Sequence, residues 1–240
     1  MKELHHENIV SLDRIFTRPS KNEVDLIYEY AEHDLADIIK VNRARMHGSP
    51  PMMPDPRFVK SVLQQILTGL AFLHKNWCMH RDMKPANILV TGASNDVNGE
   101  GGGQVKIADF GLARIFQSPL RRLSDDGEVV TIWYRAPELL LGSKHYTRAI
   151  DIFAVGCIFY ELLQCAPLFP GTEVKGSASF QIHQIQEVFK IMGKPTLEQW
   201  KGMQDCPHWP KIKNFPEKES AKRKGHQISK RANVATFLSM

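Results

Sequence analysis

The sequence has no long apolar run, no paired cysteines and no apolar segment at its amino end. Its longest apolar run, 154–160, stops at Glu161 and is far shorter than the roughly 18 residues that a membrane helix needs. The first residues contain no hydrophobic stretch of the kind found in secretory signals. The four cysteines form no C-x-x-C motif, which disfavours a metal knuckle and favours a reducing intracellular compartment. We therefore expect no membrane partner.

The body of the chain also has no excess of basic charge. The net charge of the 240 residues is +5, but residues 211–240 contain eight Lys/Arg and two Glu, so the remainder has a net charge of −1. A nucleic-acid-binding domain carries its basic patch on a folded surface, so we expect no direct nucleic-acid partner. With 42% hydrophobic and 24% charged residues, the composition is that of a globular protein.

Periodicity predicts a mixture of strands and helices. Two β-type runs, 8–16 and 23–28, flank a turn cluster and predict a hairpin. Asp55 followed by Pro56 predicts the cap and first turn of a long helix, whose apolar face runs to Leu73. Short β-type runs at 88–90 and 105–107 enclose a Gly- and Asn-rich stretch that predicts an exposed hairpin tip. Further helices are predicted at 34–45, 148–163 and 180–192.

Three motifs follow one another along the chain: His80-Arg81-Asp82-Met83-Lys84-Pro85-Ala86-Asn87, then Asp109-Phe110-Gly111, then Ala136-Pro137-Glu138. Their order resembles the catalytic loop, magnesium loop and activation-segment end of eukaryotic protein kinases. The alternative, three ordinary surface turns, would require a triple coincidence. The resemblance implies an α+β, protein-kinase-like fold, mostly the helical large lobe with only a remnant of the β small lobe. The implied regions are a small-lobe and hinge remnant at 1–33, a large lobe at 34–210 and a basic, weakly structured tail at 211–240.

The same resemblance implies the catalytic residues and the cofactors, ATP and Mg²⁺. Asp82 would orient a substrate hydroxyl and accept its proton. Lys84 resembles the lysine with which serine/threonine kinases reach the transferred phosphate. Asn87 and Asp109 would hold magnesium, for which oxygen ligands are suited.

A nucleotide site is implied around the end of the predicted hairpin. Tyr28 resembles the gatekeeper, and Glu29 and Ala31 would offer hinge backbone groups to adenine. Asp34 would face the ribose, and Leu89 would form the floor of the site.

The subfamily is indicated by Thr131-Ile132-Trp133-Tyr134-Arg135-Ala136-Pro137-Glu138, Asp109-Phe110-Gly111-Leu112-Ala113-Arg114 and Tyr30-Ala31-Glu32-His33-Asp34-Leu35. These stretches resemble the cyclin-dependent kinases, in particular the Mediator-associated members of the plant type, class E, which partner cyclin C. The resemblance implies a C-type cyclin and Mediator kinase-module subunits as partners, a role in transcription regulation and a nuclear localisation. Val129, Val130, Thr131 and Arg135 resemble the pocket for a proline after the phosphorylated residue, so Ser/Thr-Pro protein substrates are implied.

The implied activation segment has an unusual acid. Most cyclin-dependent kinases carry a phosphorylated threonine where this chain has Asp126. Its fixed charge could partly replace a phosphate near Arg81 and Arg114, or it could simply be a solvated loop acid. Glu138 would normally pair with an arginine on a later helix, and 211–240 offer no such helix pattern.

Other parts of the kinase pattern are absent from the sequence. It contains no Gly-rich phosphate loop, no Val-Ala-Ile-Lys strand lysine and no matching helix glutamate. We therefore expect a chain truncated at both ends, whose hairpin exposes Ile9, Val10 and Ile27. Two interpretations remain open: a piece of an ATP-dependent Ser/Thr kinase that is inactive by itself, or a truncated, non-catalytic interaction module. The basic tail is either a nuclear-localisation patch or solvated sequence.

Overall fold

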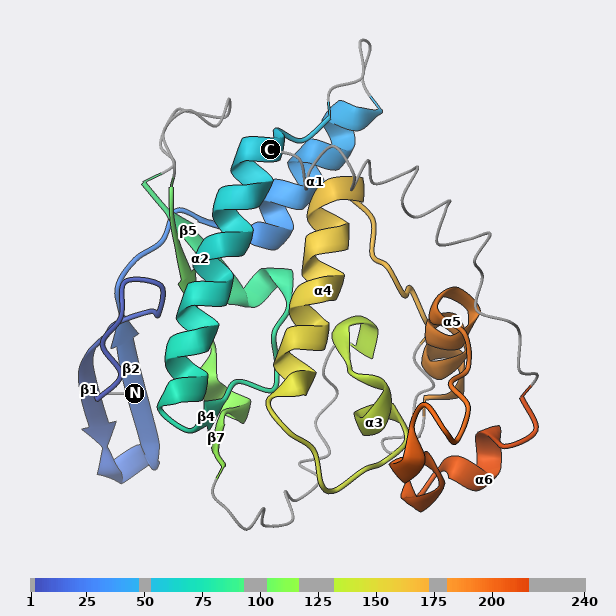
Figure 1. Cartoon of the computed structure of the whole chain (residues 1–240). Helices are drawn as coiled ribbons and strands as arrows, with labels where there is room; N and C mark the ends of the chain where they lie inside the picture. The colour runs from blue at the N-terminus through green and yellow to red at the C-terminus, as the bar shows by residue number, and fades with distance from the viewer. Residues whose placement is uncertain (1–2, 48–52, 93–102, 117–131, 173–180, 216–240) are drawn as a thin grey trace. The chain divides into compact units, whose positions relative to one another are not determined.

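The computed structural model describes residues 3–47, 53–92, 103–116, 132–172 and 181–215 (Figure 1). The chain forms two compact units, 1–116 and 117–240, which are described separately below. Both units mix helix with short strands or turns, and the α+β prediction is confirmed. The predicted hairpin tip around 93–102 and the tail beyond 215 lie outside the described residues.

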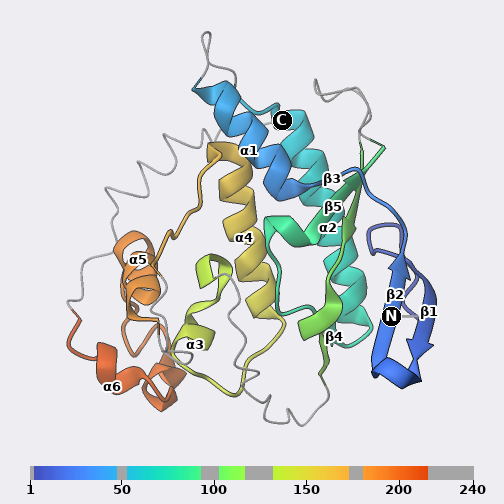
Figure 2. The same cartoon turned by 180° about the vertical axis from the view of Figure 1, so that it is seen from behind.

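The first unit begins with the predicted hairpin. Strands β1 (Leu12–Arg18) and β2 (Glu23–Tyr28) pair antiparallel, and the 3-10 helix Pro19–Lys21 connects them. Asn22 takes the left-handed conformation at φ 54° that closes this turn. The hairpin is a sheet of its own, separate from the sheet that contains β5 (Figure 2). Large apolar side chains on it are exposed, namely Ile15, Phe16, Val24, Leu26 and Ile27.

Residues 8–10, which precede the hairpin, are buried and not exposed as the sequence predicts. Ile9 and Val10 are each 2% exposed, so the prediction that the hairpin exposes them is wrong, whereas the prediction for Ile27, 43% exposed, is confirmed. The reason is that 8–10 run along the open edge of strand β6 (Gln104–Ile107). Val10 N donates to Ile107 O over 2.9 Å, and Ile107 N donates to Asn8 O over 2.9 Å.

Two further small sheets complete the first unit. Strands β3 (His33–Asp34), β5 (Ile88–Thr91) and β6 form an antiparallel sheet in that order, which confirms the predicted pairing of 88–90 with 105–107. Strand β4 (Cys78–Met79) pairs with β7 (Arg114–Ile115). These short pairings place the ends of several loops next to one another.

Two helices frame these strands. Helix α1 (Leu35–Met46) is capped by Asp34, whose Oδ1 accepts from Asp37 N over 2.9 Å. Helix α2 (Pro56–Lys75) is capped by Asp55, as predicted, and it packs against β6. Its apolar face is buried, with Val59, Ile66, Leu70 and Leu73 all at 0% exposure.

The second unit is largely helical. Its elements are the 3-10 helix Ile132–Tyr134, α3 (Pro137–Leu140), α4 (Ala149–Gln164), α5 (Ile182–Met192), the 3-10 helix Lys201–Asp205 and α6 (Trp209–Ile212). Helix α4 is buried over most of its length, and Tyr134 Oη donates to Glu161 Oε2 on it over 2.6 Å. Among the helices of the described ranges, none combines the length and apolarity needed to cross a membrane.

Candidate functional site

The first sequence motif forms a tight loop after β4. His80 is completely buried; its Nε2 donates to Ala108 O over 2.9 Å, and its Nδ1 accepts from Asp82 N over 3.3 Å. These two bonds place the ring proton on Nε2. The ring also meets Phe110 edge-on at 5.1 Å. His80 therefore holds the loop against the segment that leads to Asp109.

Asp82 is the centre of the loop's polar contacts. Its Oδ2 accepts from Lys84 Nζ over 2.7 Å and from Asn87 Nδ2 over 3.0 Å, and Asn87 Nδ2 also donates to Asp82 O over 2.8 Å. The side chain of Asp82 is 7% exposed and that of Lys84 is 21% exposed, so the ion pair is largely shielded. In the described part of the chain no hydrogen bond reaches Asp82 Oδ1, which leaves this oxygen for another donor. A fixed carboxylate beside a lysine is an arrangement that can accept a proton from a hydroxyl.

Asp109 follows the end of β6 and is exposed. It takes the left-handed conformation at φ 60°, and its Oδ1 accepts from Gly111 N over 3.3 Å at the start of the 3-10 helix Phe110–Leu112. The neighbouring Ala108 N donates to Asn87 O over 2.9 Å, so the two predicted metal-binding positions come from adjoining backbone segments.

The donor set fits a hard divalent cation. Asn87 turns its amide nitrogen to Asp82, so its amide oxygen is the ligand atom that remains, and Asp109 offers a carboxylate. Nowhere in the described residues do three His, Cys, Asp or Glu side chains gather as a metal site. Few protein oxygens, with phosphates and water completing the shell, are typical of magnesium in nucleotide sites.

The predicted nucleotide residues lie near the base of the hairpin. Asp34 and Leu89 are direct partners across β3 and β5. Tyr28 ends β2 and Glu29 follows it, with Glu29 N donating to Ser11 O over 3.2 Å. The Asp34 carboxylate caps α1, so one of its oxygens already has a structural partner.

The predicted activation-segment residues are only partly described. Arg114 on β7 pairs with Met79, two residues before Arg81, so the two arginines belong to neighbouring strand ends. Asp126, Val129, Val130 and Thr131 lie outside the described residues. Arg135 and Glu138 belong to the second unit.

Glu138 has an altered acidity. Burial raises the pKa of its carboxyl above 4.5, and a backbone hydrogen bond opposes this in part. Within the described ranges no basic side chain forms an ion pair with it. Burial without a partner favours the neutral form of a carboxyl.

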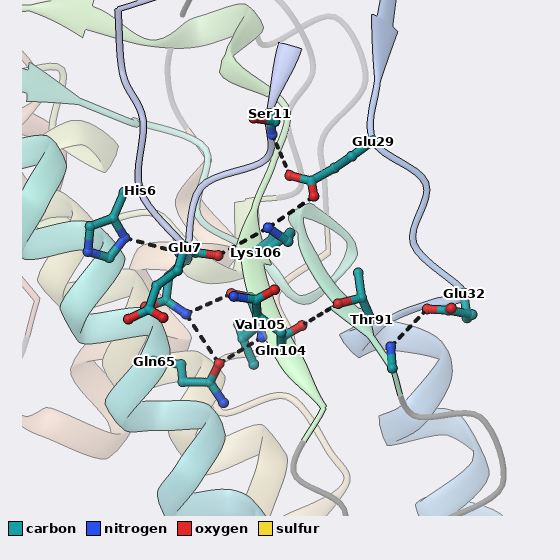
Figure 3. A network of polar contacts seen from close by, with 12 residues as sticks. His6, Glu7, Ser11, Glu29, Glu32, Gln65, Thr91, Gln104, Val105 and Lys106 are labelled. Carbon is teal, nitrogen blue, oxygen red and sulfur yellow. Dashed lines mark hydrogen bonds and ion pairs between the residues drawn. The ribbon is translucent and has the colours of Figure 1, made fainter. Parts of the chain in front are cut away.

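Two groups of contacts were not predicted from the sequence. In the first unit, the buried Lys106 holds Glu29 by an ion pair of 3.0 Å (Figure 3). In the second unit, Trp133 Nε1 donates to Gly171 O over 2.8 Å, and Gly171 N donates to Gln184 Oε1 over 3.1 Å. The sequence carried no signal for either, since a lysine in a short alternating strand and a glutamine on a helix normally face water.

The chain is similar in sequence to known proteins. Residues 1–232 match the family model described as protein kinase domain. The chain is 51% identical to Cyclin-dependent kinase E-1 of Arabidopsis thaliana over 87% of its length and 43% of the relative's. It is 46% identical to Cyclin-dependent kinase 8 of Drosophila melanogaster, over 90% of this chain and 47% of the relative. It is 47% identical to Serine/threonine-protein kinase SSN3 of Phaeosphaeria nodorum, over 89% and 46%.

The chain thus spans about half the length of the curated relatives it matches. The match to the family model nevertheless covers nearly all of the chain, including the loop around Asp82 and the segment around Asp109. The chain belongs to the protein kinase domain family and is similar to members named as cyclin-dependent kinases.

Proposed function

We propose that this chain carries catalytic residues of an ATP-dependent protein serine/threonine kinase of the cyclin-dependent class. The observation that carries the proposal is the shielded Asp82 carboxylate, which binds Lys84 and Asn87 through one oxygen and keeps the other available. Asp82 Oδ1 accepts the proton of a substrate serine or threonine hydroxyl. Lys84 then balances negative charge on the transferred phosphoryl group.

Asn87 and Asp109 are the magnesium ligands in this proposal. Magnesium, when bound, neutralises charge on the nucleotide phosphates. The backbone of Glu29 and Ala31 binds adenine, Asp34 approaches the ribose and Leu89 lies beneath the ring, while Tyr28 limits access. The contact between Asp34 and Leu89 across β3 and β5 supports this grouping.

The finer assignments rest on the sequence resemblance and on the names of the relatives. We propose Ser/Thr-Pro protein substrates, a C-type cyclin and Mediator kinase-module subunits as partners, and action in the nucleus on transcription. In this proposal Arg81, Arg114, Asp126 and Glu138 keep the activation-segment roles that the sequence resemblance implies. Val129, Val130, Thr131 and Arg135 are assigned, on the same basis, to recognition of the substrate proline. The regions 1–33, 34–210 and 211–240 keep the roles of hinge remnant, large lobe and tail.

Nucleotide binding by the full chain tests the first step. Calorimetry with ADP is expected to show an affinity that rises on adding Mg²⁺, and Asp109→Asn is expected to remove this rise. The matched control is Asp13→Asn, which changes an exposed acid on β1 and should bind as the wild type does. ADP binding that is indifferent to Mg²⁺ in all three proteins would refute the metal site.

Phosphoryl transfer tests the second step. The 240-residue chain alone is expected to transfer negligible phosphate, because its sequence has no Gly-rich loop and no strand lysine for the nucleotide phosphates. The longest natural form of the protein, together with a C-type cyclin, should phosphorylate a Ser-Pro peptide but not its Ser-Ala counterpart. Asp82→Asn in that protein should lower the rate by about 10²- to 10⁴-fold. Absence of transfer by the wild-type complex would favour the alternative, a non-catalytic interaction module.

A further inference from the structure

Lys106 is a buried cation in a strand whose neighbouring residues are apolar. Val105 and Ile107 are 0% exposed and share the opposite face of β6, which packs on α2. The Lys106 side chain, 9% exposed, extends from the other face. Among the residues that the structure describes, its ammonium reaches two oxygens, Glu29 Oε2 at 3.0 Å and Glu7 O at 3.2 Å. A buried ammonium is stable only while such partners stay in place.

Glu29 is held from both sides. While Oε2 meets Lys106, Oε1 accepts from Ser11 N over 2.5 Å, and Glu29 N donates back to Ser11 O over 3.2 Å. These contacts close the base of the β1–β2 hairpin, one step beyond the last paired residues Leu12 and Tyr28. Figure 3 shows Lys106 between Glu7 on one side and Glu29 on the other.

The position of Lys106 along the chain gives this contact a consequence. It lies three residues before Asp109 and directly opposite Leu89 across β5 and β6. One side chain therefore joins the hinge residue Glu29 to the strand that delivers the proposed magnesium ligand. Residues 8–10, which precede the hairpin, also contact this strand at Ile107.

We propose that Lys106 is a positioning residue that keeps the hinge at Glu29 in register with Asp109, so that a magnesium nucleotide binds both at once. This inference rests on the proposed function, because it assigns adenine to the hinge and Mg²⁺ to Asp109. A ligand that binds two places gains affinity only while their separation matches its own length. Loosening the Lys106 contact therefore weakens a ligand that spans both places more than a ligand that binds the hinge alone.

The test compares Mg·ADP with adenosine in the full chain by calorimetry. Lys106→Met removes the ammonium and keeps the length of the side chain. It should weaken Mg·ADP about tenfold, a coupling in the usual range, and adenosine less than twofold. Lys190→Met is the matched control, because Lys190 pairs with Glu187 over 3.2 Å on the exposed side of α5. The control should leave both affinities unchanged.

A second variant guards against a folding defect. Glu29→Gln keeps the shape and the acceptor for Ser11 N but removes the charge, and it should weaken Mg·ADP in the same direction. In the double variant the loss should be no larger than in Lys106→Met, because both changes break one contact. Additive losses, or equal losses of Mg·ADP and adenosine, would overturn the inference.

Hydrogen exchange separates this inference from the proposed function. The Ser11 amide, which donates to Glu29, should exchange about tenfold faster in Lys106→Met and at the wild-type rate in Lys190→Met. An unchanged Ser11 amide would refute the positioning contact whatever the chain binds. A wild-type chain that binds neither ADP nor adenosine would refute the proposed function itself, whereas binding of both with equal losses would refute only the inference.

Discussion

Residues 8–10 cover the edge of β6 at Ile107, and Gln65 on α2 supplies the acceptor for the edge amide at Val105. Removing this glutamine has a calculable cost. Gln65 on α2 accepts from Val105 N over 2.8 Å and from Asn8 Nδ2 over 3.2 Å through the same oxygen. Its amide nitrogen donates to Gly103 O over 3.2 Å. The same nitrogen donates to Ser61 Oγ over 3.3 Å. The test is Gln65→Leu, which keeps a side chain of similar size and removes these four hydrogen bonds.

The magnitude follows from what each partner loses. Val105 is 0% exposed, so its amide would be left buried without an acceptor, at a cost of about 1–3 kcal/mol. Asn8 keeps its second contact, to Val105 O at 2.9 Å, so the lost bond to Gln65 costs about 0.5–1.5 kcal/mol. Gly103 and Ser61 are half-buried, so water can replace Gln65 as the partner of Gly103 O and Ser61 Oγ at little cost. The half-buried leucine returns up to about 1 kcal/mol of apolar burial. The net loss is about 2 kcal/mol, or about thirtyfold in the opening equilibrium.

Hydrogen exchange at the Val105 amide measures this quantity directly, since it reports local opening and not the unfolding of the whole chain. Gln65→Leu should accelerate exchange at Val105 about thirtyfold. The matched control is Gln64→Leu on the exposed side of the same helix, which should change stability by less than about 0.5 kcal/mol. Wild-type protection of Val105 in Gln65→Leu, or an equal acceleration in the control, would refute the assignment of Gln65 as the edge acceptor.

Three other predictions concern the second unit and the cysteines. Gly171→Ala should lower the free energy of unfolding by about 1–3 kcal/mol, because a new Cβ would lie 2.7 Å from Gln184 Cα. The control Gly156→Ala on α4 places a Cβ where nothing lies within 4 Å, and it should raise the free energy of unfolding by up to about 1 kcal/mol. Thermal melting distinguishes the two, and a change of stability in the same direction in both variants would contradict the packing. Burial raises the pKa of Glu138, so the contribution of its protonated carboxyl to stability is fully present below the unfolded pKa and is lost as pH rises through the folded pKa. In pH-dependent melting, Glu138→Gln should therefore be more stable than wild type at neutral pH and equal to it in acid. A less stable variant at neutral pH would indicate an ionised, paired carboxylate. All four cysteines are buried, and burial, together with the nearby Glu161 charge, raises the pKa of Cys157 to about 12. Iodoacetamide should therefore label none of them in the native chain at mildly alkaline pH and all four in concentrated urea. Fast labelling of the native chain would contradict the burial.

Local features were predictable because neighbouring residues determine them. Asp82, Lys84 and Asn87 lie within six positions, so one tight loop is enough to bring their side chains together. Asp55 and Pro56 start a helix through bonds to the next few backbone groups. The hairpin strands are joined by a short turn, so bringing them together costs little loop-closure entropy. These features, and the family, follow from the sequence by itself.

Contacts between distant segments were decided only in the tertiary structure. Alternation predicts that Lys106 faces away from Val105 and Ile107, but not that the base of a hairpin covers it. The same holds for Ile9 and Val10, which an isolated hairpin would expose and which the open edge of β6 buries. An unpaired strand edge binds whichever backbone the fold brings to it. Periodicity describes one segment at a time, whereas the pairing of a strand edge with a distant segment depends on both segments.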